Sequence, residues 1–296
     1  MLAGVECVVS AGAQLGECPL WSGSDQRLYW VDIDGRAIHR YDPATGHDEQ
    51  RAVPAKPGSI ALTGDSGRLL VAAGLGVAFF EFEANTWEEW IGLEPEDTGN
   101  RLNDGRCDGA GRFWVGTMFD PSSAGRSTGN LHRIGPDGSA AIVRSGIGVP
   151  NGLAFSPEGR TMYWADTPRE TVWAYDYESD TGEATNERVF LDFHPLAGKP
   201  DGACVDEDGC YWVACVYGWA VMRVTPDGRI DRLIEVPVEK PTMPAFGGRD
   251  RSTLFVTSIG RPSSEPALAD DYAGGLFAMS PGVRGLPEPP FARVRP

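Results

Sequence analysis

The sequence repeats a short β-type segment six times, and this repeat limits the possible folds more than any other feature. Each segment follows a polar turn that in most cases contains glycine, a residue that suits tight hairpins. The segments are RLYWVDI (27–33), RLLVAAG (68–74), RFWVGTM (112–118), TMYWADT (161–167), CYWVACV (210–216) and TLFVTSI (253–259). Their starts are 41, 44, 49, 49 and 43 residues apart. A period of about 40 to 50 residues with several short strands in each unit is typical of β-propeller blades.

A second strand-like segment follows each repeat, for example AIHRYDP (37–43) and TVWAYDY (171–177). One blade cannot bury its own faces, whereas six blades around an axis can. No amphipathic stretch of helical period indicates βαβ units. We therefore predict an all-β, six-bladed β-propeller that forms a single domain over residues 1–296, with a solenoid or a sandwich as distant alternatives. The segment VECVVSA (5–11) should pair with the blade that begins near Pro244 and close the ring.

The net charge of −16 limits the classes of partner. An acidic surface repels phosphate backbones and anionic membranes, so we expect no nucleic-acid and no membrane partner. The longest apolar run, LLVAAGLGVAFF (69–80), is too short to span a bilayer. The first 26 residues contain no Lys or Arg, so the basic start of a secretory signal is missing. With six cysteines and no such signal, we expect a cytoplasmic protein without a disulfide framework.

Four polar residues stand ten or eleven positions before the apolar anchors of their repeats: Glu17, Asn103, Asn151 and Asp201. The first strand of a propeller blade lines the central channel, so these side chains should point toward the axis at one height. Two carboxylates and two carboxamides form an all-oxygen set that suits a hard divalent cation such as Ca²⁺. Pro-Asn-Gly or Pro-Asp-Gly alone would be an ordinary turn, but four residues in phase favour a metal site. The equivalent positions in the other two repeats, Gly58–Ser59 and Met243–Pro244, are small or apolar.

Five segments also resemble one known family, the senescence-marker-protein/gluconolactonase (regucalcin-like) family. They are LGECPLW (15–21), RLNDGRCDGAGRFWVGTM (101–118), PNGLAFSPEG (150–159), PDGACVDEDGCYWVAC (200–215) and FGGRDRSTLFVTS (246–258). The resemblance covers almost the whole chain in the same order. It implies a six-bladed propeller with one divalent metal ion in the central channel and hydrolysis of sugar-acid lactones as the commonest activity.

The resemblance also implies roles for individual residues. The metal ligands would be Glu17, Asn151 and Asp201, and the residues that contact substrate would be Arg101, Asn103 and Asp120. The segment around Asp120, FDPSSAGRS (119–127), is unlike the usual segment of the family. Ca²⁺ is the expected ion, although an oxygen site of this kind also accepts Zn²⁺, Mg²⁺ or Mn²⁺.

Lactone hydrolysis needs a polarised carbonyl and an activated water, and a metal ion can supply both. Asp201 is the candidate general base, or it orients a hydroxide held by the metal; the sequence leaves both open. Arg101 would hold substrate hydroxyls or the developing oxyanion, or else form a surface salt bridge.

The expected enzyme is a gluconolactonase- or pentonolactonase-like ester hydrolase of carbohydrate oxidation. It would act on a small sugar lactone as a monomer or a small homo-oligomer. Two other functions stay open on the same scaffold. One is a phosphotriesterase or another esterase, and the other is a calcium-binding propeller without enzymatic activity.

Overall fold

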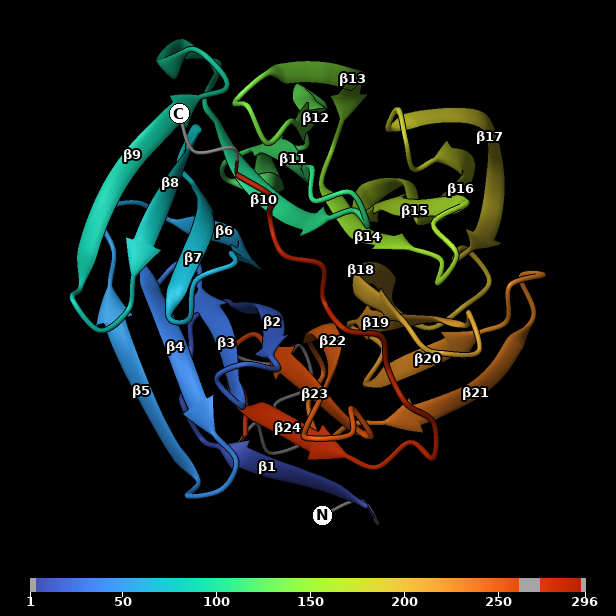
Figure 1. The fold of residues 1–296 in the computed structure, drawn as a ribbon. Coiled ribbons are helices and arrows are strands. Elements are labelled where there is room, and N and C mark those ends of the chain that lie inside the picture. The colour runs from blue at the N-terminus through green and yellow to red at the C-terminus, as the bar shows by residue number, and fades with distance from the viewer. Residues whose placement is uncertain (1–3, 261–271, 294–296) are drawn as a thin grey trace.

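In the computed structural model, which describes residues 4–260 and 272–293, six four-stranded antiparallel sheets surround a central axis (Figure 1). Five sheets pair their strands in chain order, and the first strand of each lies nearest the axis. The six-bladed β-propeller predicted from the repeat is therefore confirmed. A single domain over residues 1–296 stays a prediction.

The first three blades are formed by strands β2 to β13. Blade 1 consists of β2 (Gly16–Ser22), β3 (Arg27–Asp32), β4 (Ala37–Asp42) and β5 (His47–Ala52). Blade 2 consists of β6 (Pro57–Leu62), β7 (Arg68–Ala73), β8 (Gly76–Glu81) and β9 (Thr86–Gly92). Blade 3 consists of β10 (Asn100–Cys107), β11 (Phe113–Phe119), β12 (Gly129–Ile134) and β13 (Ala140–Ile147).

The other three blades complete the ring. Blade 4 consists of β14 (Pro150–Phe155), β15 (Thr161–Asp166), β16 (Thr171–Glu178) and β17 (Glu183–Asp192). Blade 5 consists of β18 (Lys199–Val205), β19 (Tyr211–Val216), β20 (Ala220–Val224) and β21 (Ile230–Glu235). Blade 6 consists of β22 (Pro241–Gly247), β23 (Thr253–Ser258), β24 (Leu276–Met279) and β1 (Val5–Val9).

Strand β1 closes the ring by pairing antiparallel with β24, with Val5 opposite Met279 and Cys7 opposite Phe277. The expected pairing of the opening segment with the last blade is thus confirmed. Within the described ranges, the only helices are three 3₁₀ turns, η1 (Glu96–Thr98), η2 (Ser122–Ala124) and η3 (Thr167–Arg169). No helix in these ranges is long and apolar enough to cross a membrane.

An aspartate after the inner strand organises the hairpin in two of the blades. In blade 5, Asp206 Oδ1 accepts the backbone N–H groups of Asp208 and Cys210, while Oδ2 accepts the indole N–H of Trp212 at 2.8 Å. Asp108 holds its own turn and Trp114 of blade 3 in the same way. The carboxylate therefore fixes the turn and the buried tryptophan of the next strand together.

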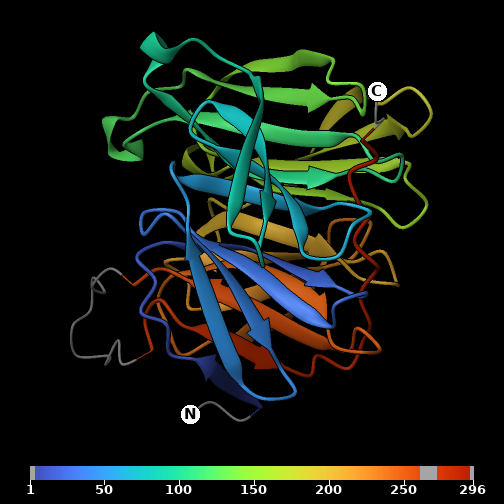
Figure 2. The ribbon, with the colours of Figure 1, turned by 60° about the vertical axis from the view of Figure 1, so that its left-hand side comes forward.

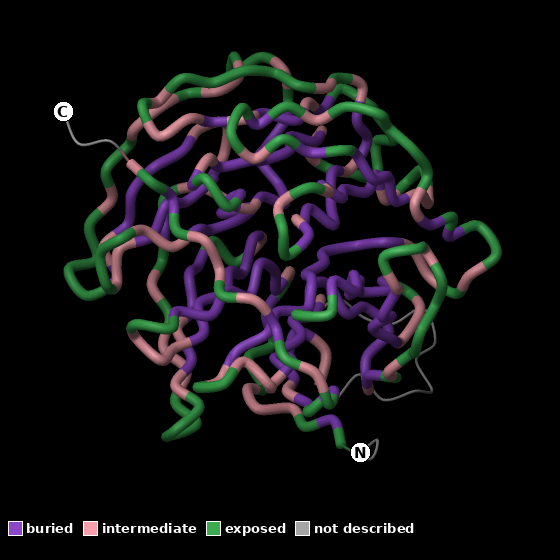
Figure 3. The backbone as a smooth tube through the Cα atoms, turned by 45° about the vertical axis from the view of Figure 1, so that its right-hand side comes forward, coloured by how far each residue is buried: buried purple, intermediate pink, exposed green. Residues whose placement is uncertain are grey.

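The core lies between neighbouring blades, and Figure 3 shows the inner strands as the buried part of the backbone. The second strands of blades 1, 3, 4 and 5 each contribute a fully buried tryptophan: Trp30, Trp114, Trp164 and Trp212. The outer strands β5, β13, β17 and β21 are largely exposed. Burial therefore decreases from the inner strands to the outer ones, and the polar residues Glu17, Asn103, Asn151 and Asp201 of the inner strands are buried as well.

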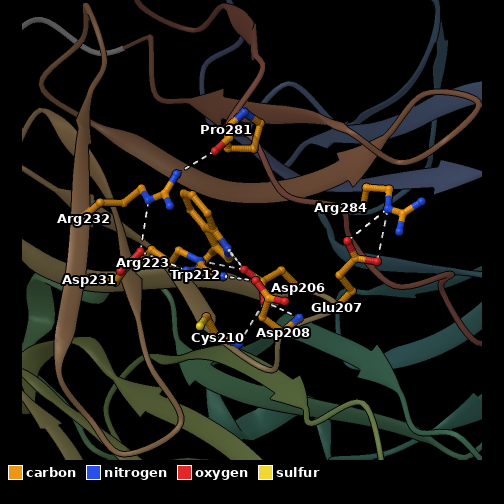
Figure 4. A network of polar contacts seen from close by, with 10 residues as sticks. All are labelled: Asp206, Glu207, Asp208, Cys210, Trp212, Arg223, Asp231, Arg232, Pro281 and Arg284. Atoms are coloured by element: carbon orange, nitrogen blue, oxygen red, sulfur yellow. Dashed lines mark hydrogen bonds and ion pairs between the residues drawn. The ribbon is translucent and has the colours of Figure 1, made fainter.

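Residues 281–293, which we call the C-terminal strap, run along one face of the ring, while η1 and η2 project from the opposite face (Figures 1 and 2). The strap first crosses blade 5, where Arg232 donates to the carbonyl of Pro281 at 2.7 Å. Arg284 forms an ion pair with Glu207 there, next to the buried network around Asp206 (Figure 4).

The strap then passes beneath the channel. Glu288 forms an ion pair with Arg106 of β10 at 2.6 Å. Glu288 and Pro289, together with inner-strand residues of blades 1, 2, 3 and 6, line a cavity of only about 10 Å³. Beyond the channel, the N–H of Phe291 donates to the carbonyl of Leu62 at 2.8 Å. The strap therefore joins blades 2, 3 and 5 and covers one end of the channel.

Candidate active site

The inner strand of every blade departs from regular pairing at the same level of the channel. The register shifts lie between Glu17 and Leu20, Pro57 and Ser59, Leu102 and Gly105, Asn151 and Ala154, Pro200 and Ala203, and Pro241 and Pro244. A β-bulge bends its strand and redirects the side chains within it. The four polar residues that the sequence placed in phase lie at four of these six equivalent irregularities.

Blades 2 and 6 have no acidic or amide side chain at the equivalent position, each for a different reason. In blade 6 the equivalent residue is Thr242, not the predicted Met243–Pro244, because Pro241 pairs with Ser258 as Pro200 pairs with Cys215. The Thr242 hydroxyl donates to the carbonyl of Gly16 at 2.6 Å. In blade 2 the position is Gly58, where a Cβ atom would lie 2.4 Å from the carbonyl oxygen of Leu102. The neighbouring strand therefore leaves no room for a side chain there.

Asn151 is held in one orientation by two neighbouring blades. Its Nδ2 donates to Thr167 Oγ1 at 2.8 Å, and this hydroxyl donates in turn to the carbonyl of Pro200 at 2.7 Å. Its Oδ1 accepts Asn103 Nδ2 at 3.0 Å. Because an amide oxygen has two lone pairs, Oδ1 retains acceptor capacity for a ligand in the channel.

Arg101, Asn103 and Asp120 lie together in blade 3. Arg101 Nη1 donates to Asn103 Oδ1 at 2.7 Å, and Arg101 Nε lies 3.8 Å from Asp120 Oδ1. Asp120 also accepts Lys56 Nζ at 2.8 Å, and Lys56 contacts Asp34 at 3.0 Å. Arg101 is buried, whereas the Asp120 side chain is 31% exposed. The result is a row of polar contacts that starts at Asn103, in which the charges of Arg101, Asp120, Lys56 and Asp34 alternate in sign.

Three acids from three blades face each other in the channel. Glu17, Asp104 and Asp201 are each less than a tenth exposed. Burial, followed by the charges of Asp201 and Asp104, raises the pKa of Glu17 well above its usual range. Burial and the charge of Asp104 likewise raise the pKa of Asp201, in spite of the hydrogen bonds from Gly202 and Glu17. Acidic groups from three blades are therefore gathered where the oxygen donors of four blades converge, and without a cation their burial disfavours the charged forms.

These residues fit a hard divalent cation. The donors are the carboxylates of Glu17 and Asp201 and the side-chain amide oxygen of Asn151, which are the ligand types that such ions prefer. Asp104 Oδ1 is buried and makes no hydrogen bond within the described residues. In the same part of the chain, no three side chains of His, Cys, Asp or Glu gather closely enough to share an ion. The fit therefore depends on Glu17 and Asp201 acting together with an amide oxygen.

The loops that lead into the inner strands are fixed by aspartates of the second strands. Asp32 at the end of β3 accepts the backbone N–H groups of Gln14 and Leu15 at 2.9 and 3.0 Å. Asp166 at the end of β15 accepts those of Gly148 and Val149 at 3.0 and 2.8 Å. The backbone just before Glu17 and Asn151 is thereby anchored on its own blade.

Sequence reasoning missed three residues of this region. Asp104 directly follows Asn103 in the segment RLNDGRCDGAGRFWVGTM (101–118) but was not among the predicted site residues. Lys56 stands in Lys-Pro-Gly (56–58), which matches Lys-Pro-Asp (199–201), so the repeat itself offered a signal. Thr167 gave no signal, because its hydrogen bond to Asn151 depends on how η3 folds over the channel.

Comparison with known proteins agrees with the fold and the resemblance. Residues 15–260 match the family model described as SMP-30/gluconolactonase/LRE-like region. The chain belongs to this family. The resemblance inferred from the five sequence segments is thus confirmed.

Two relatives and one solved structure cover the chain almost completely. A 6-deoxy-6-sulfogluconolactonase of Pseudomonas putida is 37% identical over 292 residues, which is 97% of this chain and 98% of the relative. A pentonolactonase of Haloferax volcanii is 34% identical over 286 residues, with 95% and 96% covered. The structure of a calcium-binding protein, regucalcin, from Agrobacterium tumefaciens superposes with a TM-score of 0.91 at 29% identity, covering 98% of this chain and 97% of that one.

Proposed function

We propose that this protein is a lactonase that hydrolyses sugar-acid lactones, opening an aldonolactone to the aldonic acid, with one divalent metal ion in the channel. The observation that carries the proposal is the convergence of Glu17, Asn151 and Asp201 beside the polar row of Arg101 and Asp120. Support also comes from the family of the chain and from its relatives, two of which are a sulfogluconolactonase and a pentonolactonase.

Glu17, Asn151 and Asp201 would hold the metal ion. When bound, the ion would supply Lewis acidity to the lactone carbonyl and lower the pKa of water. Ca²⁺ is the first candidate, in keeping with the calcium-binding regucalcin of similar fold, and Zn²⁺, Mg²⁺ or Mn²⁺ would fit the same donors.

The side chains of this protein would divide the remaining work. Asp201 would accept a proton from the attacking water, whose oxygen forms a bond with the carbonyl carbon. As the bond from that carbon to the ring oxygen breaks, the same proton would pass to the departing oxygen. Arg101 would stabilise the negative charge on the carbonyl oxygen through its fixed donors. Asp120 would accept hydrogen bonds from the sugar hydroxyls at the exposed end of the site.

Asn103 has a supporting role in this scheme. Both N–H groups of its amide are used, one on the carbonyl of Pro150 at 2.9 Å and one on Asn151 Oδ1. It would therefore orient the metal ligand Asn151 and the guanidinium of Arg101, and meet substrate only through Oδ1.

The test is acid release from a panel of pentono- and hexonolactones, one of them with a sulfonate at carbon 6. The protein is first stripped with chelator, and single metal ions are then added back. Asp201→Asn is compared with Asp227→Asn, the same substitution at a half-exposed turn of blade 5. We expect metal-restored hydrolysis that Asp201→Asn abolishes and Asp227→Asn retains. If no lactone opens faster than the uncatalysed blank, the proposal is wrong, and phosphotriesters become the next substrates to try.

A further inference from the structure

Asp104 belongs to the channel but has no part in the steps above. Its side chain is 5% exposed, and its Oδ2 accepts the backbone N–H of Leu153 at 2.9 Å. Leu153 follows Asn151 by two residues in β14, so this bond ties the bulge of blade 4 to β10 of blade 3. Tyr211 of blade 5 holds the same bulge from the other side, because its hydroxyl donates to the carbonyl of Gly152 at 2.7 Å.

Asp104 forms no direct ion pair within the described residues, and the charge of Arg106 acts on it only from a distance. Oδ1 makes no hydrogen bond within the described residues, and Arg106, the nearest cation along β10, already pairs with Glu288 at 2.6 Å. An ionised carboxylate with an unsatisfied oxygen is costly to bury. The neighbouring acids Glu17 and Asp201 increase this cost by repulsion. A divalent cation held by those two acids would neutralise two of the three negative charges and attract the third.

We propose that Asp104 is a positioning residue of the metal site, which adds a third negative charge without binding the ion and holds the backbone that carries Asn151. The inference rests on the proposed metal-dependent function. A direct ligand role is disfavoured, because no three acidic, histidine or cysteine side chains of the described ranges gather closely enough to share an ion.

Replacing this carboxylate by its amide separates the two effects of Asp104. Asp104→Asn keeps the shape and an oxygen acceptor for the N–H of Leu153 but removes the charge. The dissociation constant for Ca²⁺ should rise by about 10- to 100-fold, the range found when residues behind a metal ligand are changed. The melting temperature of the metal-free protein should stay the same or rise, because a buried charge without a partner has been removed.

Asp108 is the matched control, four residues further along the same blade and fully buried. Its Oδ2 accepts Arg112 Nε at 2.7 Å and the indole N–H of Trp114 at 3.3 Å, and also pairs with the Tyr177 hydroxyl. Asp108→Asn leaves these donors without a carboxylate. It should therefore lower the melting temperature of the metal-free protein and leave the dissociation constant for Ca²⁺ within twofold of the unmodified protein.

The experiment measures Ca²⁺ binding by titration calorimetry and thermal unfolding without metal, on the full chain and both variants. Weaker binding without loss of metal-free stability in Asp104→Asn supports the proposal. Unchanged affinity overturns it, and so does a drop in metal-free stability like that of Asp108→Asn. A second Ca²⁺ equivalent that disappears in Asp104→Asn also overturns it, because Asp104 would then be a ligand.

The result is distinguishable from a failure of the proposed function. If the unmodified protein binds Ca²⁺ with an affinity that depends on Asp104 but opens no lactone, the inference stands and the lactonase fails. If it opens lactones with no divalent ion bound, the lactonase stands and the inference is overturned.

Discussion

Removing the carboxylate of Glu288, which lies in the strap, should destabilise the protein far more than removing that of Glu207, which binds the strap from blade 5. Glu288 and Arg106 are 12% and 11% exposed, and their side chains lie 2.6 Å apart. Without Glu288, the guanidinium keeps one hydrogen bond, from Nη2 to the carbonyl of Ala203 at 2.9 Å. Breaking a buried ion pair typically costs about 3 to 5 kcal/mol. Because both side chains retain some contact with water, we expect the lower end, about 3 kcal/mol, for Glu288→Ala.

The assay is urea unfolding followed by tryptophan fluorescence, and the change in midpoint multiplied by the fitted slope gives the energy. Glu207→Ala is the matched control, because Glu207 pairs with Arg284 of the strap with side chains that are 40% and 60% exposed. Screening by water makes such pairs weak, so its midpoint should not move measurably. If both variants unfold at the same urea concentration, the pair under the channel contributes nothing beyond a surface contact, and the reasoning is refuted.

Three further substitutions test the site and its supports. Gly152→Ala should lower both stability and metal affinity, by more than about 1 kcal/mol in unfolding, because φ is +64° and the new Cβ would lie 2.3 Å from the Tyr211 hydroxyl. Lys56→Met removes the ammonium 2.8 Å from Asp120 and should raise the lactone KM while calorimetry finds the metal affinity unchanged. Despite burial, four hydrogen-bond donors hold the pKa of Glu94 below its usual range, so its contribution to stability is present above about pH 4.5 and lost as the pH falls. In Glu94→Gln, the urea midpoint of unfolding should therefore fall less steeply as the pH is lowered below about 4.5. A fall as steep as in the unmodified protein would show that Glu94 does not contribute to this pH dependence.

The channel residues were predictable because they repeat with the blades. Glu17, Asn103, Asn151 and Asp201 stand at fixed distances from recurrent apolar segments, and strand geometry converts that phase into a common height. The exact residue in each strand was harder to predict, because the turns differ in length. In blade 6 we predicted Met243–Pro244, whereas the equivalent residue is Thr242. A one-residue slip moves every side chain to the other face of a strand.

Residues whose roles depend on contacts between blades could not be predicted. The bond from Asp104 to Leu153 joins positions 49 residues apart, and nothing in the local sequence of either residue indicates it. The strap is the clearest case. Its sequence, PGVRGLPEPPFAR (281–293), has no strand period, and its position follows from contacts with blades 2, 3 and 5 that come earlier in the chain.

The strap has a kinetic consequence. It lies across one end of the channel, and the two cavities that Glu288 lines there, of about 10 and 190 Å³, do not reach Glu17, Asn151 or Asp201. We therefore expect a molecule of sugar size to pass through the opposite mouth. A lactone would enter, and its acid would leave, along the same path. The product must therefore vacate the site before the next substrate can bind, and it should inhibit in direct competition with that substrate.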